Sequence, residues 1–396
     1  MTLILLMDMD GTLLNNDMER FLPQYLQKLG HHLQDHVPPT RMVQSLLAGT
    51  KAMVEKQFPD KTLEQSFDEV FYPGIDGEKA KLAESIFDFY EHIYPELKVT
   101  TSVIPEAQEF IRWAFSQNYT IAIATNPLFP RSAIEQRLAW AGLPVSEYPF
   151  ALVTSFENFH FAKPNPAYYA EILGQLGWPD HPAVMVGNSR SDDLLPAQAI
   201  GLPAFLLNPS SESPQSAAES FSQVKKWIKE NETQHPTFPQ TPQALTSLLA
   251  STPAAIKTLA SSLDQKSWIK RPRPSEWSLG EIFCHLRDVD LEVTLPRTQR
   301  ILQESSPFIT AEETDVWADE RNYLQEDALN ALNGFVEARI RLLRVLRELT
   351  PDDWSRPARH AIFGPTTLSE LLVFTVTHDQ NHIRQVVKNI GWLTDK

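Results

Sequence analysis

Two aspartates one residue apart, Asp8 and Asp10, are well placed to do chemistry near the start of the chain. The apolar run from Leu3 to Leu6 has no helical period and predicts a strand buried on both faces, as in a parallel sheet. After such a strand Gly11 gives the backbone freedom to bend, so both carboxylates can reach one crevice. One carboxylate can then attack a substrate while the other transfers protons.

The stretch Met7-Asp8-Met9-Asp10-Gly11-Thr12 resembles the first motif of the haloacid dehalogenase (HAD) superfamily. The resemblance implies that Asp8 is a nucleophile that takes up a phosphoryl group and that Asp10 is its acid/base partner. Dehalogenating members of the family lack the second aspartate, so its presence here favours phosphate chemistry. The resemblance covers roughly residues 1–230.

Two further motifs of the family have counterparts in this chain. Thr125 and Asn126 follow a predicted strand over Tyr119 to Ala124, where a hydroxyl and exposed N–H groups can hold phosphate oxygens. Lys163 stands in a Lys-Pro-Asn-Pro loop before a predicted helix, and its ammonium group would offset the charge on a phosphoryl group. The resemblance therefore implies phosphate binding by Thr125, Asn126 and Lys163, with Thr125 and Lys163 also in catalysis.

The fourth motif departs from the family pattern. The predicted strand Ala183 to Val186 leads into Gly187-Asn188, where the family usually has Gly-Asp, and Asp193 matches the second acidic position. Oxygen ligands at this strand end would suit magnesium, so the expected Mg²⁺ ligands are Asp8, Asp10, Asn188 and Asp193. A neutral amide at position 188 should weaken the binding of magnesium. The expected activity is a magnesium-dependent phosphomonoester hydrolase acting through an aspartyl-phosphate intermediate.

These motifs need a scaffold that brings strand ends together. The pattern predicts an α/β domain, a doubly wound parallel sheet over residues 1–14 and 99–230. The apolar pattern over residues 15–98 predicts helices. In the HAD family such an insertion forms a helical cap that shields the active site from water. Pro-rich and Gln-rich sequence over 231–240 predicts a linker.

Beyond the linker, residues 241–396 show helical patterns and no predicted strands, which indicates an all-α bundle of four helices. Capping boxes begin helices at Ser278 and at Thr367. His285 lies on the apolar face of the first of these helices. His378 and His382 lie one turn apart on a face of the second that also carries Leu371, Phe374 and Val386.

Inward histidines are usually satisfied core residues, but three of them can bind one metal ion and leave a coordination position open. The Trp-Ser-Leu-Gly-Glu start, His285-Leu-Arg-Asp and the final His378-Asp-Gln-Asn-His382 resemble the DinB-like family, four-helix proteins with a three-histidine metal site. The resemblance implies that His285, His378 and His382 bind Zn²⁺, Ni²⁺ or another divalent transition metal. Some relatives are metal-dependent thiol transferases, so a low-molecular-weight thiol is a candidate partner.

Composition excludes several classes of partner. A formal net charge of -15 opposes nucleic-acid binding, and a single cysteine, Cys284, excludes an internal disulfide. No signal peptide or membrane span is expected, which together with the cysteine count favours a cytoplasmic protein whose substrate is a small phosphorylated metabolite. Two alternatives stay open: a non-catalytic HAD-like binding module, to which Asn188 lends weight, and a thiol S-transferase in the bundle as the main activity. The sequence does not indicate the oligomeric state.

Overall fold

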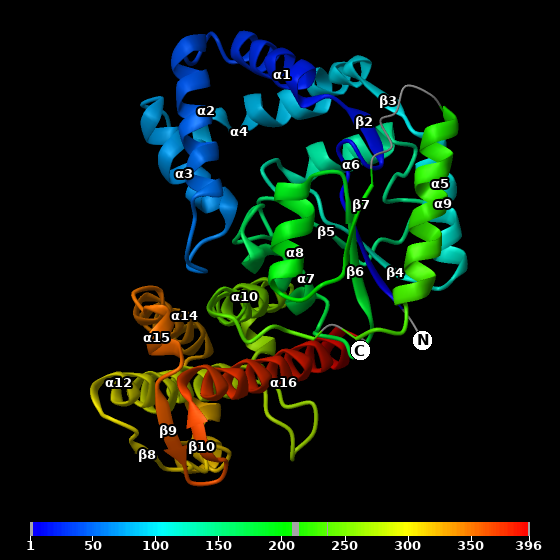
Figure 1. Cartoon of the computed structure of the whole chain (residues 1–396). Helices are drawn as coiled ribbons and strands as arrows, with labels where there is room; N and C mark the ends of the chain where they lie inside the picture. The colour runs from blue at the N-terminus through cyan, green and yellow to red at the C-terminus, as the bar shows by residue number, and fades with distance from the viewer. Residues whose placement is uncertain (1–2, 208–213, 236, 395–396) are drawn as a thin grey trace. The chain divides into compact units, whose positions relative to one another are not determined.

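The computed structural model describes residues 3–207, 214–235 and 237–394, and its contacts divide the chain into two compact units (Figure 1). The first comprises Met1–Gln57, Lys61–Tyr168 and Asp180–Thr237, and the second comprises Phe58–Asp60, Tyr169–Pro179 and Phe238–Lys396. The domain limits inferred from composition stay a prediction, and the expected linker 231–240 contains residue 236, which lies outside the described residues.

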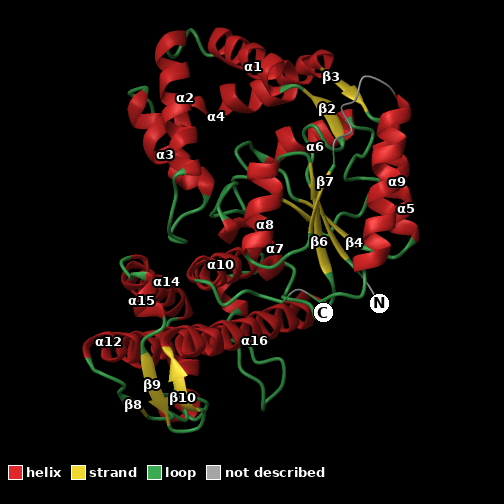
Figure 2. Ribbon diagram, viewed as in Figure 1, coloured by secondary structure: helices red, strands yellow, loops and turns green. Residues whose placement is uncertain are grey.

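A five-stranded parallel sheet forms the centre of the first unit, in the order β5-β4-β1-β6-β7. Its strands are β1 (Ile4–Met7), β4 (Thr120–Ile123), β5 (Leu152–Val153), β6 (Ala183–Gly187) and β7 (Ala204–Leu206). Every residue of β1 is buried, because this strand lies between β4 and β6 and helices cover both faces of the sheet (Figures 1 and 2). The doubly wound α/β fold expected from the sequence is confirmed.

Helices follow the strands of this sheet. They are α5 (Pro105–Ser116), α6 (Arg131–Trp140), α7 (Pro166–Gln175), α8 (Leu195–Ala199) and α9 (Pro214–Asn231). A π-helical turn, η3 (Arg190–Leu194), precedes α8 and carries Asp193. Helices α5 and α9 lie together on one side of the sheet (Figure 1). The parallel strands therefore all present their carboxyl ends at one edge.

The helical segment that was expected to form a cap lies between two short strands that sequence reasoning missed. These strands, β2 (Leu14–Asn16) and β3 (Thr101–Val103), pair antiparallel, with Leu14 opposite Val103. Between them run α1 (Met18–His32), α2 (Pro39–Val54), α3 (Leu63–Gly74), α4 (Lys79–Asp88), a π-helical turn η1 (Phe89–Ile93) and a 3₁₀ helix η2 (Tyr94–Thr100). Asp17 caps α1 by accepting a hydrogen bond from the Glu19 amide, 3.0 Å.

Four long helical segments build the second unit, as expected. They are α10 (Pro242–Ser261), the run of α11 (Leu279–Asp288), η5 (Val289–Thr294) and α12 (Leu295–Gln303), then α14 (Ala328–Arg347) and α16 (Leu368–Thr394). Helix α10 packs against α14 and α16, and α11 packs against α14. Short helical turns η4 (Gln265–Ser267), α13 (Trp317–Glu320), η6 (Tyr323–Gln325) and α15 (Pro351–Trp354) connect them.

Two expectations for this unit are wrong. The strands do not end at the linker, because β8 (Phe308–Ile309), β9 (Pro357–His360) and β10 (Gly364–Thr367) form a small sheet in the order β10-β9-β8 (Figure 2). Nor is Phe374 part of a buried face, since it is 43% exposed and its ring stacks on Phe363. Both residues line a cavity that also contains His378.

None of the helices among the described residues is long and apolar enough to cross a membrane.

Candidate functional site

The carboxyl ends of β1 and β6 bring two carboxylates to one lysine. Asp8 directly follows β1, and Asp193 lies in the turn after β6. The Lys163 ammonium group donates to Asp8 Oδ1 at 2.8 Å and to Asp193 Oδ1 at 2.5 Å. All three residues are buried, with Lys163 only 3% exposed. Asp8 lies 155 positions before Lys163 in the sequence and Asp193 lies 30 positions after it. The fold therefore brings three distant residues into one charged cluster.

Local backbone features hold this cluster in place. The second oxygen of Asp8 accepts from the Thr12 hydroxyl at 2.9 Å, and the second oxygen of Asp193 accepts from the Ser189 amide at 2.9 Å. Gly187 is needed for this approach, because a Cβ there would lie 2.3 Å from Asp193 Oδ2. Both carboxylates are thus fixed through both of their oxygens.

The surroundings of Asp8 disfavour its charge. Burial raises the pKa of Asp8 to about 7, with Lys163 opposing and the nearby Asp193 adding to the rise. One ammonium group faces two carboxylates, so the cluster carries an excess of negative charge when all three groups are ionised. An additional cation at this position would relieve that excess.

Asp10 is held in a different way. One of its oxygens accepts from the Arg137 guanidinium, and the other accepts from the Asn16 amide at 2.8 Å. Arg137, on α6, is 1% exposed and lies over the Phe129 ring at 4.7 Å. The Asp10 carboxylate is therefore fixed by partners that are not shared with Asp8.

The loop after β4 carries Thr125 and Asn126. The Thr125 carbonyl accepts from the hydroxyl groups of Thr154 and Tyr168, at 2.8 and 2.7 Å. Asn126 accepts from the Lys163 amide at 3.2 Å, which ties this loop to the lysine loop. Asn188 is exposed, and its amide nitrogen would lie 2.1 Å from a Cβ at Gly11, whose φ is +78°. Position 11 therefore requires a glycine, because the Asn188 side chain packs directly against its backbone.

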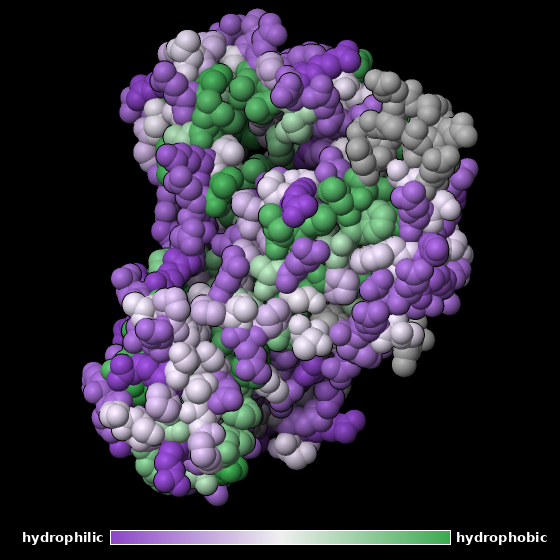
Figure 3. Space-filling model, in the orientation of Figure 1, coloured by the Kyte–Doolittle hydropathy of each residue, from purple (hydrophilic) through white to green (hydrophobic). Residues whose placement is uncertain are grey.

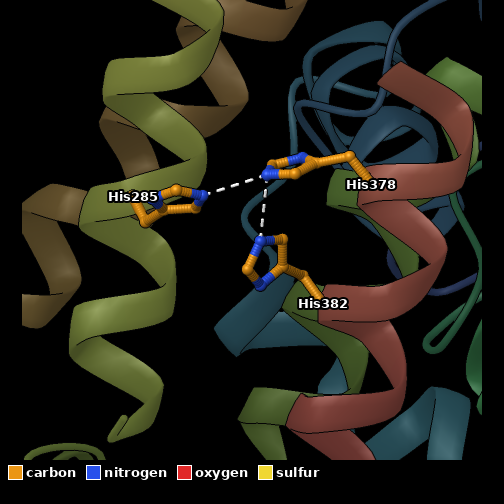
Figure 4. A group of neighbouring side chains, drawn as sticks. All are labelled: His285, His378 and His382. Atoms are coloured by element: carbon orange, nitrogen blue, oxygen red, sulfur yellow. Dashed lines mark hydrogen bonds between the residues drawn. The ribbon is translucent and has the colours of Figure 1, made fainter. Parts of the chain in front are cut away.

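Three histidines meet in the second unit (Figure 4). The Nε2 atom of His378 lies 3.0 Å from the Nε2 atoms of His285 and of His382. Among the described residues this is the group of three potential metal ligands whose ligand atoms all lie within 4.8 Å of one another. Gln385 Oε1 lies 2.8 Å from His382 Nδ1, which fixes the orientation of that ring.

Two of these histidines, His285 and His382, are neutral at ordinary pH. Burial, aided by the neighbouring imidazoles, lowers the pKa of His285 to about 2 and that of His382 to about 3. The Trp277 ring stacks on His382 with an interplanar angle of 4°. Three converging imidazole nitrogens fit a divalent transition metal, which binds imidazole through its lone pair.

Comparisons with known proteins agree with both parts of the fold. Residues 3–201, about half of the chain, match the family model described as haloacid dehalogenase-like hydrolase. The chain belongs to the haloacid dehalogenase-like hydrolases. Residues 248–386 match the DinB superfamily model. The family identification made from the first motif, and the expectation of an enzyme of the hydrolase class, are confirmed.

Individual relatives of this hydrolase are distant. A phosphoglycolate phosphatase of Pseudomonas fluorescens is 24% identical over 214 residues, which are 52% of this chain and 69% of the relative. The solved structure of a HAD phosphatase from Thermococcus onnurineus is 19% identical, covers 59% of this chain and 100% of its own, and has a TM-score of 0.38. YfiT from Bacillus subtilis, a four-helix bundle, is 20% identical, covers 39% and 89% of the two chains, and has a TM-score of 0.35.

Sequence reasoning missed three residues of the hydrolase site. Thr12 stands within the first motif, so its contact with Asp8 could have been anticipated from the motif itself. Asn16 and Arg137, which bind Asp10, have no signal in the sequence. Arg137 lies on an ordinary helix 127 positions from its partner, and only the fold brings the two together.

Proposed function

We propose that the first unit is a phosphomonoester hydrolase in which Asp8 is the nucleophile. The observation that supports this proposal is the buried contact of Lys163 with both Asp8 and Asp193 at the carboxyl edge of the sheet. Ligands of open parallel sheets bind at this edge. The same contact argues against the alternative of a non-catalytic binding module, because a buried charge cluster is costly to keep without a chemical use.

The reaction has two displacement steps. An Asp8 oxygen attacks phosphorus in line and forms an aspartyl phosphate, while the bond from phosphorus to the alcohol oxygen breaks and that oxygen takes a proton from Asp10. Water then attacks the same phosphorus, gives a proton to Asp10, and releases phosphate and the Asp8 carboxylate. Lys163, Thr125 and Asn126 bind the phosphoryl oxygens, and Arg137 with Asn16 holds Asp10 in position.

The residues around Asp8 fit a magnesium ion. The negative excess at Asp8 and Asp193 and the raised pKa of Asp8 both favour a cation, and the exposed Asn188, whose side chain lies against Gly11 of the first motif, carries an amide oxygen of the kind that magnesium binds. We propose Asp8, Asp10, Asn188 and Asp193 as its ligands, with the Asp10 side chain already engaged by Arg137 and Asn16. When bound, magnesium supplies positive charge that offsets the charge on the transferring phosphoryl group.

The decisive experiment is turnover of 4-nitrophenyl phosphate by the purified protein with and without Mg²⁺. We expect Asp8→Asn to lower kcat by at least a thousandfold, because the amide cannot form the covalent intermediate. Asp35→Asn, an exposed aspartate of the cap, is the control and should keep full activity. Turnover by Asp8→Asn that equals the wild type would refute the assignment.

For the second unit we propose a divalent transition metal, Zn²⁺ or Ni²⁺ or a related ion, bound by His285, His378 and His382. The support is the convergence of their Nε2 atoms. Three protein ligands leave a position for water or substrate, and a metal there activates a bound water or thiol.

A thiol S-transferase is the second candidate for this unit. The observation that favours it is a cavity of about 170 Å³ that contains His378 together with Val293, Leu371 and Phe374. A substrate bound in that cavity would lie beside His378, one of the residues that would hold the metal. Transfer to a low-molecular-weight thiol that is lost with a chelator and with His378→Ala would support this activity, and transfer that persists in both would exclude it.

A further inference from the structure

An apolar cavity of about 270 Å³ lies within the first unit, lined mostly by the helices of the cap and partly open to solvent. Its walls come from the helices α1, α2, α3 and α4, from Tyr90 in η1, from the loop after β4 and from Phe156 after β5. Most of the wall is aliphatic or aromatic, including Leu29, Leu46, Phe67, Phe71 and Phe129. Apolar surface is also visible on the cap in the space-filling view (Figure 3).

This cavity adjoins the phosphate site on two sides. The loop that carries Thr125 and Asn126 continues directly into the wall residues Leu128 and Phe129, and the Leu128 amide donates to the Asn126 carbonyl at 2.8 Å. The Phe129 ring lies under Arg137, which binds Asp10. A group esterified to a phosphate held at Asp8 would therefore reach the cavity.

On the other side, the wall residue Met18 is a contact of Asn16. The Asn16 amide lies 3.8 Å from the Met18 sulfur and donates to Asp10 at 2.8 Å. Asp10 is the residue that would protonate the leaving oxygen. The leaving alcohol, and not the phosphate, is thus the part of the substrate that would occupy the cavity.

Most polar side chains in the wall already have hydrogen-bond partners within the protein. The Tyr25 and Tyr90 hydroxyl groups lie 3.0 Å apart, and the Thr50 hydroxyl donates to the Leu46 carbonyl at 2.9 Å. A polar ligand would have to break these contacts to gain its own, which makes its binding weak.

The charged part of the wall also disfavours an anion. Its lysine, Lys79, donates to Glu64 at 2.6 Å and to Asp68 at 2.7 Å, so this group carries an excess negative charge. Arg137, which lies over the wall residue Phe129, is bound to Asp10 and is 1% exposed. A substrate with a carboxylate in its alcohol part would need a cation in the cavity wall. It would instead be repelled by the excess negative charge of the Lys79, Glu64 and Asp68 group.

We propose that the substrate is a phosphate monoester of a hydrophobic alcohol or phenol whose apolar part fills this cavity, and not a phosphorylated hydroxy acid. This inference rests on the proposed phosphatase activity of the first unit. Apolar cavities of about 150 Å³ stay dry and bind benzene, so the cap has room for a naphthyl ring or an alkyl chain of about eight carbons. Hydrolysis would release the hydrophobic alcohol and inorganic phosphate.

The test compares kcat/KM for butyl, hexyl and octyl phosphate, 2-naphthyl phosphate and phosphoglycolate with the full-length protein and Mg²⁺. Each buried methylene should raise kcat/KM about fourfold, so the four additional methylenes of octyl phosphate should raise it roughly 250-fold over butyl phosphate. Phosphoglycolate should be the poorest substrate. A flat alkyl series, or a preference for phosphoglycolate, would overturn the inference while Asp8-dependent turnover still supported the phosphatase. Absence of any Asp8-dependent turnover would overturn both.

Two variants of α2 link the preference to the cavity. Leu46→Trp fills the cavity and Leu47→Glu adds a charge to its wall at a position that is 49% exposed, where folding should tolerate the change. Both should flatten the chain-length dependence, with octyl phosphate losing at least tenfold in kcat/KM. Phe87→Glu, an exposed cap residue outside the wall, should keep the wild-type dependence. If the dependence of kcat/KM on chain length in Leu47→Glu equalled that of the wild type, the proposal would be contradicted even if Leu46→Trp failed to fold.

Discussion

At the residue scale, Asp8 faces the Asp193 carboxylate with a single ammonium group between them. The folded protein raises the pKa of Asp8 from 3.8 to about 7, chiefly by burial. Above pH 7 both folded and unfolded chains carry the charge, and folding must bury it. As the pH falls from 7 toward 4 the folded state binds the proton first, so this penalty disappears and the stability rises.

We therefore expect Asp8→Asn to stabilise the first unit at pH 8 in the presence of a chelator, by roughly 2 to 4 kcal/mol. The gain should shrink as the pH is lowered to 4, and Mg²⁺ should abolish it by stabilising the wild type. Hydrogen exchange of the β1 amides measures the stability of this unit alone. A pH-independent difference between the two proteins would contradict this account.

Arg137 acts on Asp10, so its replacement should affect the protonation of the leaving group. We expect Arg137→Gln to lower kcat about a hundredfold for butyl phosphate, whose alkoxide leaves poorly without a proton. The loss should be much smaller for 4-nitrophenyl phosphate, whose phenolate leaves readily. Arg131→Gln, an exposed arginine of the same helix, is the control. Equal losses for both esters would indicate a merely structural role for Arg137.

The sequence predicted those site residues that stand in motifs at strand ends, because strand ends and loops have local signals. Asp8, Lys163 and Asp193 were found in this way, and the structure brings them into contact. Arg137 could not be found, since its role depends on the packing of α6 against the first motif and not on its neighbours in sequence. The roles of all these residues remain predictions until they are measured.

At the element scale, a buried arginine joins the segments of the bundle. Arg339 on α14 is fully buried and bonds to Asp290 in η5, to Asp379 on α16 and to the Leu249 carbonyl of α10. Its removal would leave two buried carboxylates without their cation. Such uncompensated charges are among the most destabilising defects in a protein.

We expect Arg339→Met to destabilise the bundle by about 3 to 5 kcal/mol. The triple variant Asp290→Leu/Arg339→Met/Asp379→Leu should recover most of that loss, because no charge is then left unpaired. Arg341→Met, an exposed residue on the same helix, should change stability by less than about 0.5 kcal/mol. Hydrogen exchange of the α14 amides provides the measurement, and equal protection in Arg339→Met and Arg341→Met would refute the role.

The elements that were predicted and those that were missed differ in length. Helices such as α10 and α14 repeat their apolar pattern over 20 residues, which is a strong signal. Strand β8 has two residues, and β9 and β10 have four each, too few for an alternating pattern to stand out. Their pairing depends on backbone groups that only tertiary structure brings together.

At the scale of the whole molecule, the two candidate sites draw on different units of the chain. Asp8, Lys163 and Asp193 belong to the first unit, while His285, His378 and His382 belong to the second. Neither set contains a residue of the other. The two chemistries should therefore be separable by single substitutions.

We expect His378→Ala to lose most of its bound transition metal, measured by inductively coupled plasma mass spectrometry, and to keep phosphatase activity within twofold of the wild type. Asp8→Asn should show the opposite pattern, with normal metal content and no activity. Thr377→Ala, an exposed neighbour of His378, should retain both properties. Loss of phosphatase activity in His378→Ala alone would show that the sites depend on each other.

The paired strands β2 and β3 bear on how such a hydrolase acquires new specificities. The two connections between cap and core run side by side as the antiparallel pair β2 and β3, with Leu14 opposite Val103 and Asn16 opposite Thr101. Residues 17–100 thus form a cassette with adjoining ends, and a different cap could be grafted at this pair of strands without rerouting the central sheet. If the cap holds the alcohol part of the substrate as proposed, exchanging this one segment would change the substrate and leave the central sheet unaltered.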